Sequence, residues 1–119
     1  MRIVHFELPA DDPTRCMRFY ERAFGWRFEK WDGPMPYWMI KTGDGPGIDG
    51  GLAHRDHPGQ QSTNVVSVPS VDDSTKAILA AGGTATVPKM AVPGVGWAAY
   101  FTDTEGTAFG IIQFDPAAV

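Results

Sequence analysis

Two residues near the start of the sequence could carry out acid–base chemistry together. His5 and Glu7 are two positions apart in an apolar run, and side chains at i and i+2 of a strand share a face. A carboxylate beside an imidazole orients the ring and raises its pKa. We therefore predict His5 as a catalytic acid–base group and Glu7 as its orienting partner. The competing interpretations are a structural histidine and a glutamate paired with a scaffold lysine or arginine.

Other residues could bind a ligand without reacting with it. Asp49 precedes Gly50-Gly51, where missing side chains let a ligand approach the backbone, although an ordinary turn aspartate fits the same pattern. Lys89 follows a proline in a stiff segment, and it could present an ammonium group to an anion or simply face solvent. Aromatic residues on predicted strands suit a flat, partly apolar ligand. They are Tyr37, Trp38, Trp97 and Tyr100.

Strands and helices that alternate along the chain must position these side chains. Residues 2–8 form a predicted strand with Val4, Phe6 and Leu8 toward the core. Asp12-Pro13 starts a helix that ends at Gly25. Its predicted buried stripe is Cys16, Phe19, Tyr20, Ala23 and Phe24. Further strands are expected over residues 26–31, 37–41, 48–54, 64–68, 84–87, 95–102 and 107–114, and a second helix between Asp72-Asp73 and Gly82-Gly83.

The order of these elements repeats once. Asp11-Asp12 corresponds to Asp72-Asp73, and Gly45 to Gly106, with an offset of 61 residues in both cases. One strand–helix–three-strand unit leaves a sheet face and two edges exposed, so two copies should pair. The sequence predicts a single α+β domain over 1–119, with one βαβββ module at about 1–56 and another at about 62–116. They would form a curved mixed sheet with helices outside and a concavity bearing His5 and Glu7.

Composition excludes several classes of function. The formal net charge of −4 leaves no basic surface for nucleic acid. No apolar run approaches the roughly 18 residues of a membrane span, and the start of the chain lacks the pattern of a secretory leader. We therefore expect no nucleic-acid or membrane partner and a cytoplasmic location. The single cysteine, Cys16, cannot form an internal disulfide and is expected in the core.

Several motifs resemble one superfamily. The run from His5 to Pro13, then Phe19-Tyr20 and Phe24-Gly25-Trp26, is similar to glyoxalase-related proteins of the vicinal oxygen chelate superfamily. Further similar motifs are 47–52, 87–90 and 103–106. This superfamily includes glyoxalases, bleomycin-resistance proteins and dioxygenases. The chain resembles the branch described as predicted enzymes related to lactoylglutathione lyase, which implies the fold of two paired modules.

The resemblance also implies where a metal would bind. Metal-using members take one ligand from the first strand and one from the last strand of each half. These positions fall on His5 and Asp49 in the first half, and on Val66 and Gly110 in the second at an offset of 61. An offset of 60 gives Val65 in place of Val66, which also lacks a ligand atom. We therefore expect no full metal site, with His5 and Asp49 as weak candidates, and Val66 as an apolar wall of the pocket.

The function predicted from these residues is a pocket that takes a small organic molecule. His5 would catalyse a lyase or isomerase-type proton transfer without a four-ligand metal, and no cofactor is expected. One alternative is a non-catalytic protein that sequesters a drug or metabolite. Another is a metal-dependent glyoxalase or dioxygenase, with a divalent ion as cofactor. Exposed strand edges suggest a homodimer.

Overall fold

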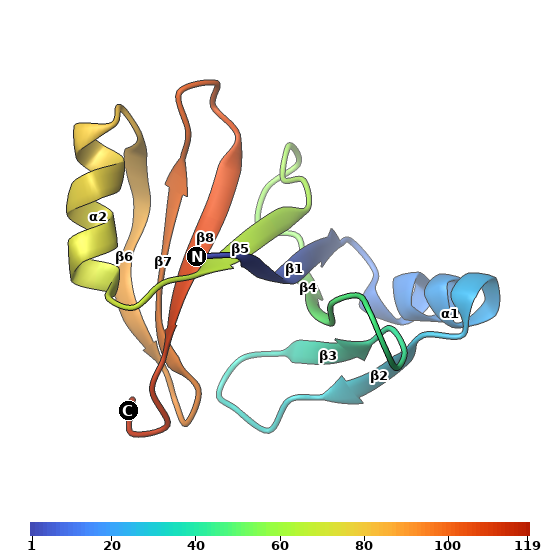
Figure 1. The fold of residues 1–119 in the computed structure, drawn as a ribbon. Coiled ribbons are helices and arrows are strands. Elements are labelled where there is room, and N and C mark those ends of the chain that lie inside the picture. Colours follow the sequence, from blue (N-terminus) through green and yellow to red (C-terminus); the bar gives the residue numbers. More distant parts are fainter. The chain divides into compact units, whose positions relative to one another are not determined.

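The computed structural model describes all 119 residues and contains eight strands and two helices (Figure 1). Their order is β1 (Ile3–Ala10), α1 (Pro13–Phe24), β2 (Arg27–Lys30), β3 (Tyr37–Lys41), β4 (Gly50–His54), β5 (Thr63–Ser67), α2 (Val71–Ala80), β6 (Thr84–Val92), β7 (Gly96–Thr102) and β8 (Ala108–Phe114). The strand–helix–three-strand order therefore occurs twice, as the sequence predicts. The α+β class is confirmed. Neither helix has the length and apolarity needed to cross a membrane.

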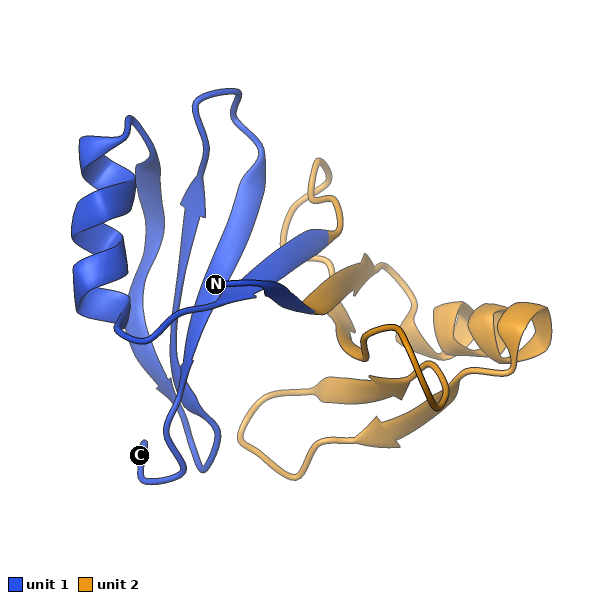
Figure 2. Ribbon diagram, viewed as in Figure 1, with its two compact units in different colours: residues 1–4, 63–119 blue, residues 5–62 orange.

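The chain divides into two compact units, which are coloured separately in Figure 2. Unit 1 contains Met1–Val4 and Thr63–Val119, and unit 2 contains His5–Ser62. The first four residues belong with unit 1, where the Ser67 amide donates to the carbonyl of Arg2 at 2.9 Å. The polar segment at 55–62 therefore ends one unit and leads into the other, where the sequence predicts a linker.

Unit 2 is a four-stranded mixed sheet in the order β2-β3-β4-β1. Strands β1 and β4 are parallel, whereas β2–β3 and β3–β4 are antiparallel. On one face of the sheet, Ala10, Ile40 and Leu52 are buried together with partly buried residues of α1 and neighbouring strands. Phe6 and Leu8 belong to this cluster, as the two-residue period predicts.

Helix α1 begins and ends where the sequence predicts. The Asp12 side chain accepts a hydrogen bond from the Arg15 amide at 3.1 Å, and Gly25 closes the helix with φ of 73°. The predicted buried stripe is only partly correct. Cys16 packs in the core, but Phe19 is 59% exposed and Phe24 is 66% exposed. The helix turns Met17 toward the sheet instead, because burial follows the position of the sheet and not apolar spacing alone.

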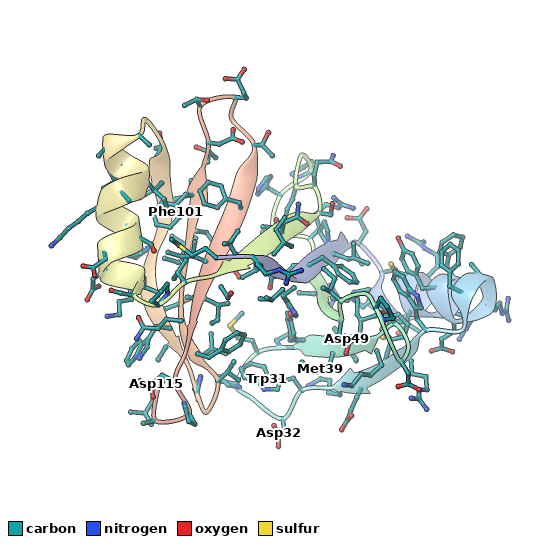
Figure 3. All side chains as sticks on the ribbon, viewed as in Figure 1. Trp31, Asp32, Met39, Asp49, Phe101 and Asp115 are labelled. Atoms are coloured by element: carbon teal, nitrogen blue, oxygen red, sulfur yellow. The ribbon has the colours of Figure 1, made fainter.

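Unit 1 has the same construction, with the order β5-β8-β7-β6 and β5 parallel to β8. The core under α2 contains Val68, Val71, Ala99, Phe101 and Ile111, and Figure 3 labels Phe101 within it. On the other face, Val4 packs with Val65, Ala98 and Ile112. Val4 is thus core, as predicted, but in a different cluster from Phe6 and Leu8. Helix α2 is capped by Ser70, one residue before the helix begins at Val71, and not by Asp72.

Strand β6 is longer than the sequence predicts. The two prolines suggest that strand structure stops at Val87, yet β6 continues through Pro88 to Val92. Its pairing with β7 shifts register between Ala85 and Val87 and again between Val87 and Met90. Because β6 is the last strand in its order, the missing N–H of Pro88 removes no bond from an interior ladder.

Candidate functional site

His5 and Glu7 lie on the face of the unit 2 sheet opposite α1. Their neighbours on β1, Phe6 and Leu8, pack in the cluster on the helix side, and successive strand side chains alternate between faces. Both side chains are half-buried. Strand β4 runs beside β1 with Glu7 opposite Gly51. The predicted pair therefore shares one face of one sheet, next to a strand position that carries no side chain.

Tyr37, the first residue of β3, brings His5 and Glu7 together. Its hydroxyl oxygen lies 2.7 Å from His5 Nε2 and donates a longer hydrogen bond to Glu7 Oε2 at 3.4 Å. His5 and Glu7 therefore meet through a shared phenol. The sequence pattern identified Tyr37 only as one aromatic residue among several. The informative signal is its register, since alternation puts it on the opposite face from Trp38.

The position of Tyr37 depends on the glycine beneath it. A Cβ built on Gly51 would lie 1.6 Å from the Tyr37 hydroxyl and 2.0 Å from Cζ, far inside van der Waals contact. Trp31 packs against the same ring, edge to face, with centroids 6.1 Å apart. Figure 3 labels Trp31, just after the end of β2, and Met39 on β3. The phenol therefore packs against both a tryptophan and bare backbone.

The electrostatics of this cluster favour neutral rings. Burial lowers the pKa of His5, against the opposing effects of the Glu7 and Asp49 carboxylates. Burial also raises the pKa of Tyr37, and the charge and hydrogen bond of Glu7 raise it further. At neutral pH the imidazole is consequently unprotonated at one nitrogen, and the phenol keeps its proton. A neutral imidazole is the form that accepts a proton.

Asp49 closes the loop between β3 and β4. Its Oδ1 accepts from the Thr42 amide at 3.0 Å and the Thr42 hydroxyl at 3.2 Å, and its Oδ2 pairs with Lys41 at 3.3 Å. The amide and hydroxyl of Thr42, with Lys41, lower the pKa of Asp49. A shallow polar hollow of about 150 Å³ lies in the same loop, between 42 and 49. These contacts are those of a loop-closing aspartate.

The donor set does not fit the metal implied by the family. The structure contains no group of three or more histidine, cysteine, aspartate or glutamate side chains that could hold a metal ion. The two oxygens of Asp49 contact Thr42 and Lys41, and His5 Nε2 contacts Tyr37. A stable divalent site needs several protein ligands with good geometry. The side chains around His5 and Asp49 therefore do not make a set of divalent-metal ligands.

The remaining predicted ligand-binding residues pack mostly on the helix sides of the sheets. Trp38 joins the cluster under α1, where Lys30 lies 5.9 Å from its ring centroid. In unit 1, Val66 and Trp97 join the cluster under α2. Lys89 pairs with Asp72 at 3.3 Å and lies over the Trp97 ring, so its charge is already matched within the unit.

Tyr100 in unit 1 also lies against a glycine, although its register position differs from that of Tyr37, which is opposite Ala53. It lies opposite Gly110 on β8, and a Cβ at Gly110 would come within 2.7 Å of its ring. The strand pairs also correct the alignment of the halves. Trp38 is opposite Leu52 and Trp97 is opposite Gln113, and Leu52 and Gln113 are related by the offset of 61, so Trp97 corresponds to Trp38. By face, the counterpart of His5 is Val65, at the shorter offset of 60.

Comparison with known proteins gives a family match for the start of the chain. Residues 2–43 match the family described as bleomycin resistance protein-like N-terminal. This segment includes His5, Glu7 and Tyr37. Comparison with curated proteins found no match.

Solved structures match over almost the whole chain. A hypothetical protein from Bacillus halodurans C-125 has a TM-score of 0.72 at 12% identity, covering 99% of this chain and 97% of its own. Methylmalonyl-CoA epimerase from Mycobacterium tuberculosis has a TM-score of 0.70 at 13% identity, covering 97% and 89%. A variant of the Streptomyces coelicolor epimerase, in complex with 2-nitronate-propionyl-CoA, has a TM-score of 0.69 at 15% identity, covering 100% and 98%. The TM-scores show a shared fold, and at these identities they show the fold alone.

The N-terminal family match, the repeated βαβββ order and the solved structures agree with the motifs in the sequence. Residues 2–43 are thus similar to a bleomycin resistance protein-like N-terminal family, and the whole chain shares its fold with methylmalonyl-CoA epimerases.

Proposed function

We propose that this protein binds a small organic molecule and transfers a proton on it, with His5 as the acid–base group. The observation that carries the proposal is the contact of 2.7 Å between His5 Nε2 and Tyr37, with Glu7 on the same hydroxyl. Perturbed titratable groups gathered on one surface are typical of acid–base sites. Because burial lowers the pKa of His5, the free base is present at neutral pH.

The reaction proposed is proton transfer at a carbon next to a carbonyl. The C–H bond breaks, its proton moves to the imidazole, and its electron pair becomes an enolate on the substrate. The imidazolium then returns the proton to the same carbon or to a neighbouring atom, which gives an isomerase. A lyase reaction would instead require the enolate electron pair to form a double bond and expel a leaving group from the neighbouring carbon, with the imidazolium donating its proton to that group. The similar fold of epimerases, one of them in complex with 2-nitronate-propionyl-CoA, supports an acyl thioester as the first substrate to try.

His5→Ala tests the catalytic role. We expect turnover of an acyl thioester, measured as deuterium exchange from D₂O at its α-carbon, to fall by about 10² to 10⁴-fold. Binding of the same thioester should change far less, since the imidazole acts on one proton only. Tyr20→Phe on α1 is the control. Unchanged exchange and unchanged binding in His5→Ala would remove His5 from the site.

The second candidate is a binding protein that sequesters a drug or metabolite. The match of residues 2–43 to the bleomycin resistance protein-like family favours it. Sequestration needs a complementary surface but no acid–base residue. Saturable binding of bleomycin by calorimetry, with no product after long incubation and no α-proton exchange on any thioester, would support this candidate against the first.

A metal-dependent glyoxalase or dioxygenase is tested by metal analysis. The donor set predicts that the purified protein holds less than one equivalent of any divalent ion and loses it on dialysis. One equivalent that survives dialysis against a chelator, and that restores activity when removed and returned, would establish the metal-dependent reaction instead.

We also propose a cytoplasmic homodimer. Strands β2 and β6 each lack a strand partner on one side, which supports pairing with a second copy. Sedimentation equilibrium should give twice the mass of 12.9 kDa, and a monomer across the micromolar range would contradict the proposal.

A further inference from the structure

The Tyr37 hydroxyl has one proton and two neighbours that could accept it. A phenol can donate only one hydrogen bond, while its oxygen can accept others. Glu7 Oε2 lies 3.4 Å away and His5 Nε2 lies 2.7 Å away. Two arrangements therefore satisfy the His5 contact: either Tyr37 donates to the imidazole, or the imidazole donates to Tyr37.

The two arrangements leave Glu7 in different situations. If Tyr37 donates to His5, a carboxylate oxygen and a phenol oxygen face each other at 3.4 Å with no proton between them, in a half-buried place. If His5 donates, the hydroxyl proton is free to point at Glu7, and each contact becomes a hydrogen bond. The Glu7 contact of 3.4 Å is long, but in this arrangement a hydroxyl proton, and not a lone pair, faces the carboxylate. The second arrangement is therefore favoured.

We infer that Glu7, Tyr37 and His5 form a directed relay, in which Tyr37 holds the imidazole with its proton on Nε2 and leaves Nδ1 as the basic atom. Tyr37 is thus a positioning residue that acts through His5. The relay also aligns the negative charge of Glu7 with the imidazole, so that an imidazolium formed at Nδ1 is stabilised through the phenol.

The packing around the Tyr37 ring explains how the relay keeps its geometry. The ring cannot move toward the sheet, because it already contacts the backbone at Gly51. Trp31 packs edge to face against the same ring and further limits its movement. Burial and Glu7 together raise the pKa of Tyr37, so the phenol keeps its proton throughout the pH range of ordinary biochemistry. The relay is therefore built from a rigid phenol that does not ionise.

Any ligand of His5 meets a single lone pair on the ring. With Nε2 occupied by Tyr37, only Nδ1 is left to accept a hydrogen bond. A ligand must therefore present a hydrogen-bond donor or an acidic C–H to Nδ1, which excludes ligands that present only acceptors. The role of Nδ1 as a base rests on the proposed function, whereas the hydrogen-bond directions do not.

The tautomer of His5 can be read directly by nitrogen-15 NMR on the whole protein without any ligand. The chain has three histidines, so a His5→Gln sample identifies the signals of His5. At pH 7.5 we expect two-bond H–N correlations of the Nε2–H tautomer and an Nε2–H proton visible through slow exchange with water. Tyr37→Phe should remove the visible proton, and the control Tyr20→Phe should retain it.

Two results would overturn the relay. An Nδ1–H tautomer in the wild-type protein would mean that Tyr37 donates to His5. An Nε2–H proton that is equally protected in Tyr37→Phe would mean that Tyr37 does not hold it. Folding of each variant is checked from the backbone amide spectrum, and Glu7→Gln gives a second variant that keeps the volume of the side chain. The NMR experiment uses no substrate. A negative result for the relay is therefore distinct from a negative result in the His5→Ala turnover assay.

Discussion

At the scale of single residues, the site depends on the absence of a Cβ atom at Gly51. Gly51 lies beneath the Tyr37 ring, and its replacement by alanine would put a methyl group 1.6 Å from the hydroxyl. The Tyr37 ring must then leave His5, because the obstacle is attached to rigid strand backbone. Overpacking of this kind costs about 1–3 kcal/mol.

We therefore predict that Gly51→Ala lowers the free energy of unfolding by about 1–3 kcal/mol and also removes the slowly exchanging His5 proton. Urea denaturation and NMR measure the two effects. Gly59→Ala is the matched control: Gly59 has no positive φ, and its nearest neighbour is 4.0 Å away, so the change should stay within about 0.5 kcal/mol. Loss of stability with an intact proton signal would contradict the claim that the contact at Gly51 keeps the Tyr37 ring beside His5.

His5 should also make stability depend on pH. Its pKa in the folded protein is lowered from 6.5 by burial, so the unfolded chain binds the proton more readily. Stability then falls as pH drops through the unfolded value near 6.5, and the loss ends below the folded value. His5→Gln should weaken the difference between denaturation at pH 7.5 and pH 5. An unchanged pH dependence would show that His5 is not desolvated.

The catalytic pair could be predicted from sequence, but the residue between its members could not. His5 and Glu7 share a face because of the strand period, which is a local property. Tyr37 reaches them through the pairing of β3 with β4 and of β4 with β1, across 32 residues from His5. Two long-range registers must be known before that contact appears, and periodicity specifies neither.

At the scale of elements, strand and helix positions follow local signals, while burial does not. Residues 37–41 form β3 at the predicted bounds, and Asp12 and Gly25 limit α1 as expected. Phe19 has the apolar type and spacing of a core residue, yet it lies on the solvent side of α1. Which apolar side of a helix meets the sheet depends on tertiary packing. The helix period alone leaves that choice open.

The different burial of two phenylalanines gives a direct test. Phe101 is 1% exposed under α2, whereas Phe19 is 59% exposed. We predict that Phe101→Ala costs about 3–5 kcal/mol, because it empties a packed core. Phe19→Ala should cost less than about 1 kcal/mol. Denaturation of both variants under one buffer measures the contrast, and equal costs would place Phe19 in a buried contact.

The outer strands show how the elements limit unwanted pairing. Strand β2 has only four residues, Arg27–Lys30, and three of them are charged. Strand β6 carries Pro88 and two register shifts. Short length, charge, proline and bulges are the common ways in which sheet edges avoid aggregation. We therefore expect strands β2 and β6 either to pair specifically with a second copy of the chain or to remain unpaired.

At the scale of the whole molecule, charge contributes little to stability. The three ion pairs are Lys41–Asp49, Arg55–Asp11 and Lys89–Asp72, and at least one partner in each is well exposed. Exposed pairs contribute about 0–1 kcal/mol each and are screened by salt. Apolar clusters in each unit supply the stability instead.

We predict that raising NaCl from about 0.05 to 0.5 M changes the free energy of unfolding by less than about 2 kcal/mol. Urea titrations at both salt concentrations measure the change. Lys89→Met should likewise cost no more than about 1 kcal/mol, since its ammonium pairs at the surface. A loss well above these values would mean that an ion pair is screened from water in solution.

The contact between Tyr37 and Gly51 also implies that these two positions cannot vary independently. A methyl group at 51 is harmful only while the aromatic ring occupies the space above it. Tyr37→Ala removes that ring, so adding Gly51→Ala afterwards should cost much less than it does alone, and the two costs should fail to add. In the double variant, two methyl groups replace the phenol beside the imidazole. We expect such a protein to keep its fold and to accept a bulkier ligand near His5.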